Sequence, residues 1–140
     1  MFSIHSVSSD RELVFHHRKG EYFFVELKDS NLSVITEVWD GMESSNGLCE
    51  LFQELSDFKT PWQGERVWES LEGEFGISAT CTLLGHVIFS VKMAGQLGGV
   101  EEWNVQAALE TELGQLDKIA RNIRVFFKKE KFFVSKTSNS

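Results

Sequence analysis

The chain contains little of several residue types whose abundance would place it in a special structural class. Its 140 residues include one proline and two cysteines, and no long apolar run occurs. The scarcity of proline argues against a disordered chain. Without a long apolar run, we expect neither a signal peptide nor a membrane span. Cys49 and Cys81 are too few and too far apart for a disulfide framework or a zinc site, which predicts a cytoplasmic protein.

The short signatures of catalytic, metal and phosphate sites are missing as well. No two histidines or cysteines have a spacing typical of zinc ligands, and no serine or cysteine stands in a nucleophile elbow. His16 and His17 are neighbours in a predicted strand, so they point to opposite faces and cannot bind one metal together. The segment 95–99, GQLGG, lacks the strand–loop–helix context of a phosphate loop. These absences predict a protein without catalysis, metal or cofactor.

Aromatic bulk and alternating apolar residues are what the chain does have. Twelve phenylalanines and four tryptophans supply a core for one domain, which at this length buries roughly two thirds of the surface of its unfolded chain. Alternation of apolar and polar residues is typical of strands with one buried face. It predicts eight strands, at residues 2–6, 12–18, 21–28, 32–39, 67–75, 77–84, 86–93 and 101–112.

Two segments have the apolar spacing of a helix with one buried face. The first segment carries Leu48, Leu51, Phe52, Leu55 and Phe58, and the second carries Leu116, Ile119, Ala120, Ile123 and Phe126, each 68 residues further along the chain. Asn46 is the predicted N-cap of the first helix, and Pro61 is expected to end it. Gly114 is the predicted N-cap of the second, with Asp117 in its first turn.

The order of these elements predicts a single α+β domain over residues 1–128. It consists of two ββββα halves, residues 1–60 and 61–128, because runs of strands followed by a helix are typical of this class. We expect one large antiparallel sheet or two adjoining sheets, with both helices packed on one face. Residues 129–140 are either a basic tail or a short closing strand.

His86 is the histidine whose position most suggests an active site. It follows Leu84-Gly85, which predicts a hairpin because glycine accepts positive φ without steric cost. Strand alternation places His86 on the more exposed face, with no orienting acid at a fixed spacing, so a structural role is favoured. Glu72 and Glu74 are expected on one face of the strand 67–75, as a solvated edge. A pocket containing His86 and Glu72 is the less favoured alternative.

Charge and tryptophan define the predicted partner-binding residues. The net charge is −7, which divides into −13 for residues 1–117 and +6 for residues 118–140. An acidic body repels nucleic acid and attracts basic proteins, while the basic end is interpreted as the cationic face of the last helix. The candidate contacts with a partner are Glu50, Glu54 and Asp57 on the first helix, and Trp62 and Trp68 around QGERV. The two tryptophans could equally hold that helix against the sheet.

The second half of the chain resembles a known family. Its pattern is W-x-G with a second tryptophan, then S-L-E, G-H-V, a further tryptophan and G-Q-L-x-x-I-A-x-x-I-x-x-F. The matching positions are Trp62, Gly64, Trp68, Ser70, Leu71, Glu72, Gly85, His86, Val87, Trp103, Gly114, Gln115, Leu116, Ile119, Ala120, Ile123 and Phe126. The pattern resembles short bacterial domains of unknown function and, more distantly, WapI-type immunity proteins, which neutralise toxins of contact-dependent competition. The resemblance implies a fold and brings no catalytic residues.

Three functions follow as hypotheses. The leading one is a non-catalytic bacterial protein-binding module in the cytoplasm, such as an immunity protein that covers a basic toxin domain. The second is a structural or regulatory homodimer, joined through a sheet edge or the tryptophan region. The third is an enzyme or a small-ligand-binding protein that uses His86 and Glu72. Neither nucleic acid nor a membrane is an expected partner.

Overall fold

A computed structural model describes residues 1–128, apart from the side chains of residues 17 and 18. The predicted tail or closing strand at 129–140 lies outside the described residues. Twelve elements follow one another within residues 1–128. The strands are β1 (Phe2–His5), β2 (Glu12–Lys19), β3 (Tyr22–Lys28), β4 (Ser33–Trp39), β5 (Arg66–Glu69), β6 (Phe75–Cys81), β7 (His86–Gly95) and β8 (Trp103–Glu112). The main helices are α1 (Ser45–Asp57) and α2 (Leu116–Phe126), and short 3-10 helices at Gly41–Glu43 and Leu113–Gln115 precede them.

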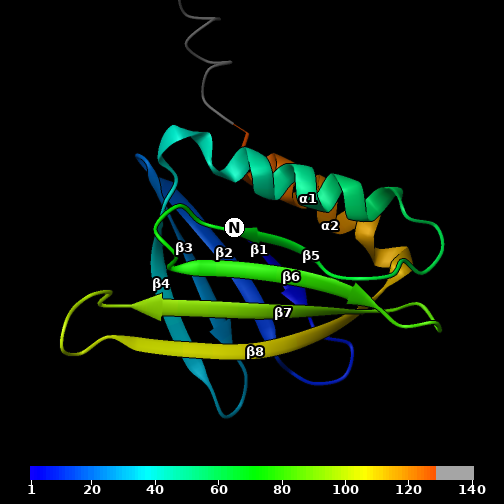
Figure 1. Cartoon of the computed structure of the whole chain (residues 1–140), viewed down its shortest axis with the longest axis horizontal. Coiled ribbons are helices and arrows are strands. Elements are labelled where there is room, and N and C mark those ends of the chain that lie inside the picture. The colour runs from blue at the N-terminus through cyan, green and yellow to red at the C-terminus, as the bar shows by residue number, and fades with distance from the viewer. Residues whose placement is uncertain (129–140) are drawn as a thin grey trace, which may run out of the picture.

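The strands form two separate four-stranded antiparallel sheets. The first has the order β1-β2-β3-β4 and the second the order β5-β6-β7-β8, so every strand pairs with its neighbour in sequence. Figure 1 shows the second sheet in front of the first, with both helices lying along the same side of the pair. The predicted α+β fold of two ββββα halves is confirmed. Of the two predicted arrangements, one large sheet or two adjoining sheets, the structure has two sheets. Within residues 1–128, no helix is long and apolar enough to cross a membrane.

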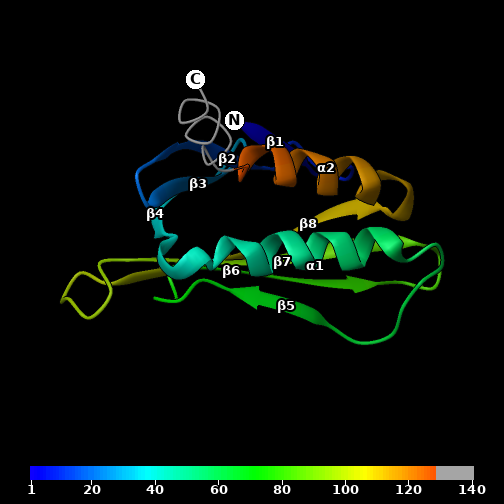
Figure 2. The ribbon, with the colours of Figure 1, turned by 90° about the horizontal axis from the view of Figure 1, so that it is seen from above.

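Each helix packs against the sheet of the other half. The two helices lie side by side (Figure 2), with α1 against β5 of the second sheet and α2 against β1 of the first. The sheets also contact each other directly, where β1 meets β8 and β4 meets β7. The apolar stripe of each helix is therefore buried only when both halves are folded together.

One hydrophobic core runs through both sheets and both helices. Of the five apolar positions predicted for each helix, the first four are buried. The last is partly buried: Phe58 directly follows α1, and Phe126 is the last residue of α2. Phe15 of β2 lies at the centre of an aromatic cluster. Its ring stacks on Phe2 at 4.9 Å and meets Phe75 of the second sheet edge-on at 5.9 Å. The same ring contacts three further phenylalanines, Phe23, Phe126 and Phe127.

The predicted N-caps of both helices are wrong. Asn46 is already the second residue of α1, and a buried carboxylate from outside the helix binds the N-terminus instead. Asp40 accepts hydrogen bonds from the Ser45 backbone N–H and hydroxyl, both at 2.7 Å. α1 ends at Asp57 and Phe58 is already extended, so the helix ends before Pro61, the predicted stop. Gly114 lies within the 3-10 helix, so it does not cap α2.

The predicted strand 67–75 is also wrong, because a turn divides it. Residues 70–74 join β5 to β6, and Gly73 has a φ of 80°, which only glycine adopts without strain. The Ser70 N–H donates to the Phe75 carbonyl at 2.8 Å and closes this hairpin. Glu72 and Glu74 therefore do not share a strand face: Glu72 is exposed and Glu74 is buried.

The hairpin predicted at Gly85 is confirmed. β6 ends at Cys81, β7 begins at His86, and Gly85 has a φ of 87°. The connection is longer than two residues, and its ends are closed by a hydrogen bond from the Thr82 N–H to the His86 carbonyl at 2.8 Å. His86 lies on the outer face of the second sheet, as strand alternation predicts.

Candidate functional site

The predicted acidic residues of α1 form an exposed stripe. Glu50, Glu54 and Asp57 lie on the solvent side of the helix, opposite its buried leucines. Glu54 Oε1 is 3.3 Å from Arg66 Nε, and Asp57 Oδ1 accepts a hydrogen bond from Gln53 at 3.3 Å. These are exposed contacts that water and salt weaken. We call Glu50, Glu54 and Asp57 the acidic stripe, and its carboxylates are accessible to a partner.

The helix beside the acidic stripe has the opposite charge. On α2, Lys118, Arg121 and Arg124 are exposed. Arg124 Nη1 donates to Gln53 Oε1 of α1 at 2.6 Å, which joins the two helix surfaces. Because the helices lie side by side (Figure 2), a helix with an acidic exposed face lies next to one with basic exposed residues. A partner that covers both helices must therefore present basic groups to α1 and groups that are not basic to α2.

Trp62 and Trp68 do not form an exposed recognition patch. The Trp62 side chain is 6 % exposed and stacks on Phe58 with ring centroids 4.9 Å apart. The Trp68 ring is partly buried, and its Nε1 donates to the Ser44 carbonyl at 3.0 Å, just before α1. Trp68 of β5 thus attaches the start of α1 to the second sheet, and Trp62 packs on the residue that follows α1. The burial of Trp62 argues against its assignment as a partner-binding residue. A tryptophan is amphipathic, so the sequence left both positions open.

His86 faces two glutamates that the sequence analysis missed. Its Nδ1 lies 3.2 Å from Glu110 Oε2 and 3.2 Å from Glu112 Oε1. The register of β7 and β8 pairs His86 with Glu112, and Glu110 lies two residues earlier on the same face. The i, i+2 spacing of the glutamates was visible in the sequence. Their position opposite His86 depends on the strand register, which was not.

The structure places His86 and Glu72 apart, which argues against the less favoured alternative of one pocket containing both. Glu72 lies in the turn before β6 and His86 follows the turn after it, so β6 separates them. A different hollow, of about 510 Å³, lies on the open face of the second sheet. Its polar lining residues are Glu69, Lys92, Asn104 and Gln106. The register places Glu69, Gly76, Lys92 and Gln106 in one row across the sheet, and the missing side chain at Gly76 leaves space in that row.

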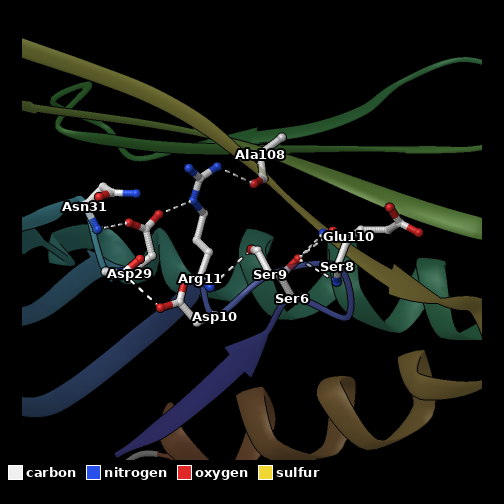
Figure 3. Close-up of polar contacts among 10 residues, drawn as sticks. Ser6, Ser8, Ser9, Asp10, Arg11, Asp29, Asn31, Ala108 and Glu110 are labelled. Atoms are coloured by element: carbon white, nitrogen blue, oxygen red, sulfur yellow. Dashed lines mark hydrogen bonds and ion pairs between the residues drawn. The ribbon is translucent and has the colours of Figure 1, made fainter.

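The loop between β1 and β2 joins the two sheets at the edge of β8 (Figure 3). The Val7 N–H donates to the Glu110 carbonyl at 2.9 Å, and the Glu110 N–H donates to Ser6 Oγ at 3.1 Å. Arg11 Nη1 donates to the Ala108 carbonyl at 2.9 Å, while its Nε donates to Asp29 Oδ2 at 2.8 Å. We call residues 6–11 the β8 clamp. It supplies hydrogen-bond partners for backbone groups of β8, an edge strand whose outer N–H and carbonyl groups would otherwise be unpaired.

Asp29 holds the arginine of the β8 clamp. Its hydrogen bond from Arg11 lowers the pKa of the Asp29 carboxyl below the ordinary value of 3.8, and a hydrogen bond from the Asn31 N–H lowers it further. A carboxyl whose pKa is lower in the folded than in the unfolded protein stabilises the fold above the unfolded pKa. That contribution is lost as the pH falls through the folded pKa.

We therefore expect the substitution D29N to destabilise the protein at pH 7, and this difference to shrink as the pH falls below 3.8. Urea unfolding of both proteins at pH 7, 4 and 3 measures it. A difference that stays the same at all three values would mean that the charge of Asp29 contributes nothing.

The two cysteines are free thiols. Cys49 lies in α1 and Cys81 at the end of β6, both partly buried. Burial raises the pKa of the Cys81 thiol above its ordinary value of 9.0. The thiolate is the nucleophilic form, so this environment makes Cys81 less reactive near neutral pH.

The model of a family of unknown function, DUF6228, matches residues 5–130. No curated protein and no solved structure matches the chain.

Proposed function

The chain belongs to the DUF6228 family, and we propose that it is a non-catalytic protein-binding module whose acidic stripe binds a basic protein. The observation that carries the proposal is the exposure of Glu50, Glu54 and Asp57 along one face of a helix that is fixed in place. The specific form we propose is a bacterial cytoplasmic immunity protein, with a basic toxin domain as its partner.

The packing of α1 supports this role. The Asp40 carboxylate binds the start of the helix, Trp68 of β5 donates to the Ser44 carbonyl just before it, and Trp62 stacks on Phe58 just after it. A binding surface on a rigid element loses little conformational entropy when the partner binds. The acidic stripe is therefore presented in one orientation in the free protein.

The chemistry of the acidic stripe indicates what kind of partner it binds. Three exposed carboxylates accelerate association with a basic surface and make it sensitive to salt, because exposed charges are screened within about 8–10 Å at ordinary ionic strength. The adjacent basic surface of α2 repels the same partner wherever that partner is uniformly basic. This combination favours a partner whose basic patch is about as wide as one helix.

Charge reversal of the acidic stripe tests the proposal. We expect the variant E50K/E54K/D57K to bind the partner at least about tenfold more weakly at low salt, a loss of about 1.4 kcal/mol. The matched control E37K/E72K/E101K changes the net charge equally at three exposed residues outside α1. Tagged versions of the three proteins are used for capture from host extract at low and high salt, with quantitative mass spectrometry.

The comparison of the two variants separates a specific surface from net charge. A basic protein that the wild type and the control capture, and that the acidic-stripe variant loses, supports the proposal. Equal loss in both variants would show that only net charge matters, and equal retention would remove α1 from the interface. Circular dichroism of each variant checks that α1 is still folded.

A homodimer is the second candidate, and one observation favours it. β8 is an edge strand, and within residues 1–128 the β8 clamp reaches only its Ala108 and Glu110 backbone groups. The earlier part of this edge, from Trp103 to Ala107, can pair with the same strand of a second copy. Light scattering decides this point: a mass that doubles with concentration identifies the dimer, and a constant monomer mass rejects it.

A further inference from the structure

We propose that His86, Glu110 and Glu112 form a binding site for a divalent transition-metal ion of the zinc type. One imidazole nitrogen and two carboxylate oxygens converge there, all within 4.8 Å of one another. The three side chains come from the start of β7 and the end of β8, on the outer face of the second sheet. This site is separate from the acidic stripe, so it stands or fails independently of the proposed function.

The distances fit a coordination shell. A metal that binds each ligand at about 2.1 Å places neighbouring ligand atoms about 3.0 Å apart in octahedral and about 3.4 Å apart in tetrahedral geometry. His86 Nδ1 is 3.2 Å from Glu110 Oε2 and 3.2 Å from Glu112 Oε1, between these limits. Two of the three distances among these ligand atoms therefore already suit a coordination shell, and only the two carboxylate oxygens have to adjust to each other.

The ligand set indicates the kind of ion. Imidazole suits zinc and its neighbours among the transition metals, whereas magnesium and calcium prefer shells made entirely of oxygen. With neutral histidine the two carboxylates give the cluster a charge of about −2, which a divalent ion balances. The side chains of His86, Glu110 and Glu112 are 38 %, 29 % and 47 % exposed, so water can complete the coordination.

The backbone of the site is held on both sides. The β8 clamp binds the N–H and the carbonyl of Glu110 through Ser6 and Val7, and Figure 3 shows the Glu110 carboxylate directed away from this loop. On the other side, the Leu113 N–H donates to the Gly85 carbonyl at 3.1 Å, which joins the end of β8 to the start of β7. A site on paired strands keeps its ligands more precisely than a site on loops.

The other described histidine side chains show what distinguishes His86. His5 Nδ1 lies 3.3 Å from Glu12, but the Lys28 ammonium is 3.4 Å from the same carboxylate and already balances its charge. His16 Nε2 lies 2.8 Å from Glu26. Each of these histidines contacts one carboxylate. Among the described side chains, only the His86 cluster brings a third ligand within reach.

Zinc titration of the full chain tests the proposal. Isothermal calorimetry in a buffer without metal affinity is expected to give one zinc ion per chain, with binding at least about tenfold weaker in H86A and E112Q. The matched control H16A removes a histidine with a single carboxylate partner, and we expect it to bind zinc like the wild type. In a two-dimensional NMR spectrum, the zinc-induced shifts should lie in the first residues of β7 and the last of β8.

Two ligand variants, H86A and E112Q, are used so that the test still gives an answer if one of them does not fold. Circular dichroism without metal selects the folded variants, and Glu112 is exposed enough for E112Q to keep the fold. No binding up to about 1 mM zinc would overturn the proposal. Equal weakening in H86A and H16A would also overturn it, because it would show scattered binding to surface histidines.

Discussion

Replacing Phe15 by alanine is expected to lower the free energy of unfolding by about 3–5 kcal/mol, the largest effect of any substitution proposed for this protein. The Phe15 side chain is fully buried, and its ring contacts Phe75 across the two sheets as well as phenylalanines of β1, β3 and the end of α2. The loss includes the cavity that remains, because surrounding rings relax only partly. Urea unfolding of the wild type and F15A measures it.

Val125 provides the control for this substitution. It lies on α2 with 72 % of its surface exposed, so V125A removes apolar atoms without opening a cavity. We expect its free energy of unfolding to stay within about 0.5 kcal/mol of the wild type. Similar losses in F15A and V125A would contradict a core shared by the two halves and centred on Phe15.

Replacing Glu74 by alanine is expected to cost about 2–4 kcal/mol of stability. Its carboxylate is 7 % exposed and accepts hydrogen bonds from the Trp39 N–H at 3.2 Å and from the Ser70 hydroxyl. The carboxylate thus joins the end of β4 to the turn between β5 and β6. Alanine removes the acceptor of both donors. An unpaired buried donor costs about 1–3 kcal/mol, and the part-buried Trp39 N–H lies at the lower end of that range. Chemical unfolding at pH 7 gives the difference.

Two further variants separate the hydrogen bonds of Glu74 from its charge. E72A removes an exposed carboxylate from the same turn, so we expect a change of at most about 0.5 kcal/mol. E74Q keeps the shape and can still accept from the Trp39 N–H, so we expect a smaller loss than in E74A. If E72A and E74A were equally stable, the link between the two sheets through Glu74 would contribute nothing.

The sequence predicts the helices of this fold better than its turns. Apolar spacing located both helices and their buried faces, since a helix that packs on a sheet must keep its apolar residues on one side. The prediction of a strand over residues 67–75 is wrong. Residues 70–74 alternate like a strand, but Gly73 and the hydrogen bond between Ser70 and Phe75 form a turn there. The predicted N-cap of α1 is wrong because Asp40, from outside the helix, binds the helix N-terminus.

The candidate sites also differ in how well the sequence predicts them. The acidic stripe was predictable, because charged residues opposite a buried helix face have to be exposed. Trp62 and Trp68 were ambiguous, since an indole suits both a core and an interface, and the structure places them in the packing around α1. The sequence could not predict the partners of His86. A shift of one residue in the pairing of β7 and β8 would turn Glu110 and Glu112 to the other face of the sheet.

Site-specific photo-crosslinking tests most directly whether α1 is the binding surface. Asn46 is exposed and lies one turn before Glu50 on the same face as the acidic stripe, whereas Val100 is exposed in the loop between β7 and β8. A photoreactive residue replaces each in turn, and the tagged protein is irradiated in host extract at low salt. We expect a basic protein to be crosslinked from position 46 and not from position 100. A partner crosslinked from position 100 alone would contradict the proposed binding surface.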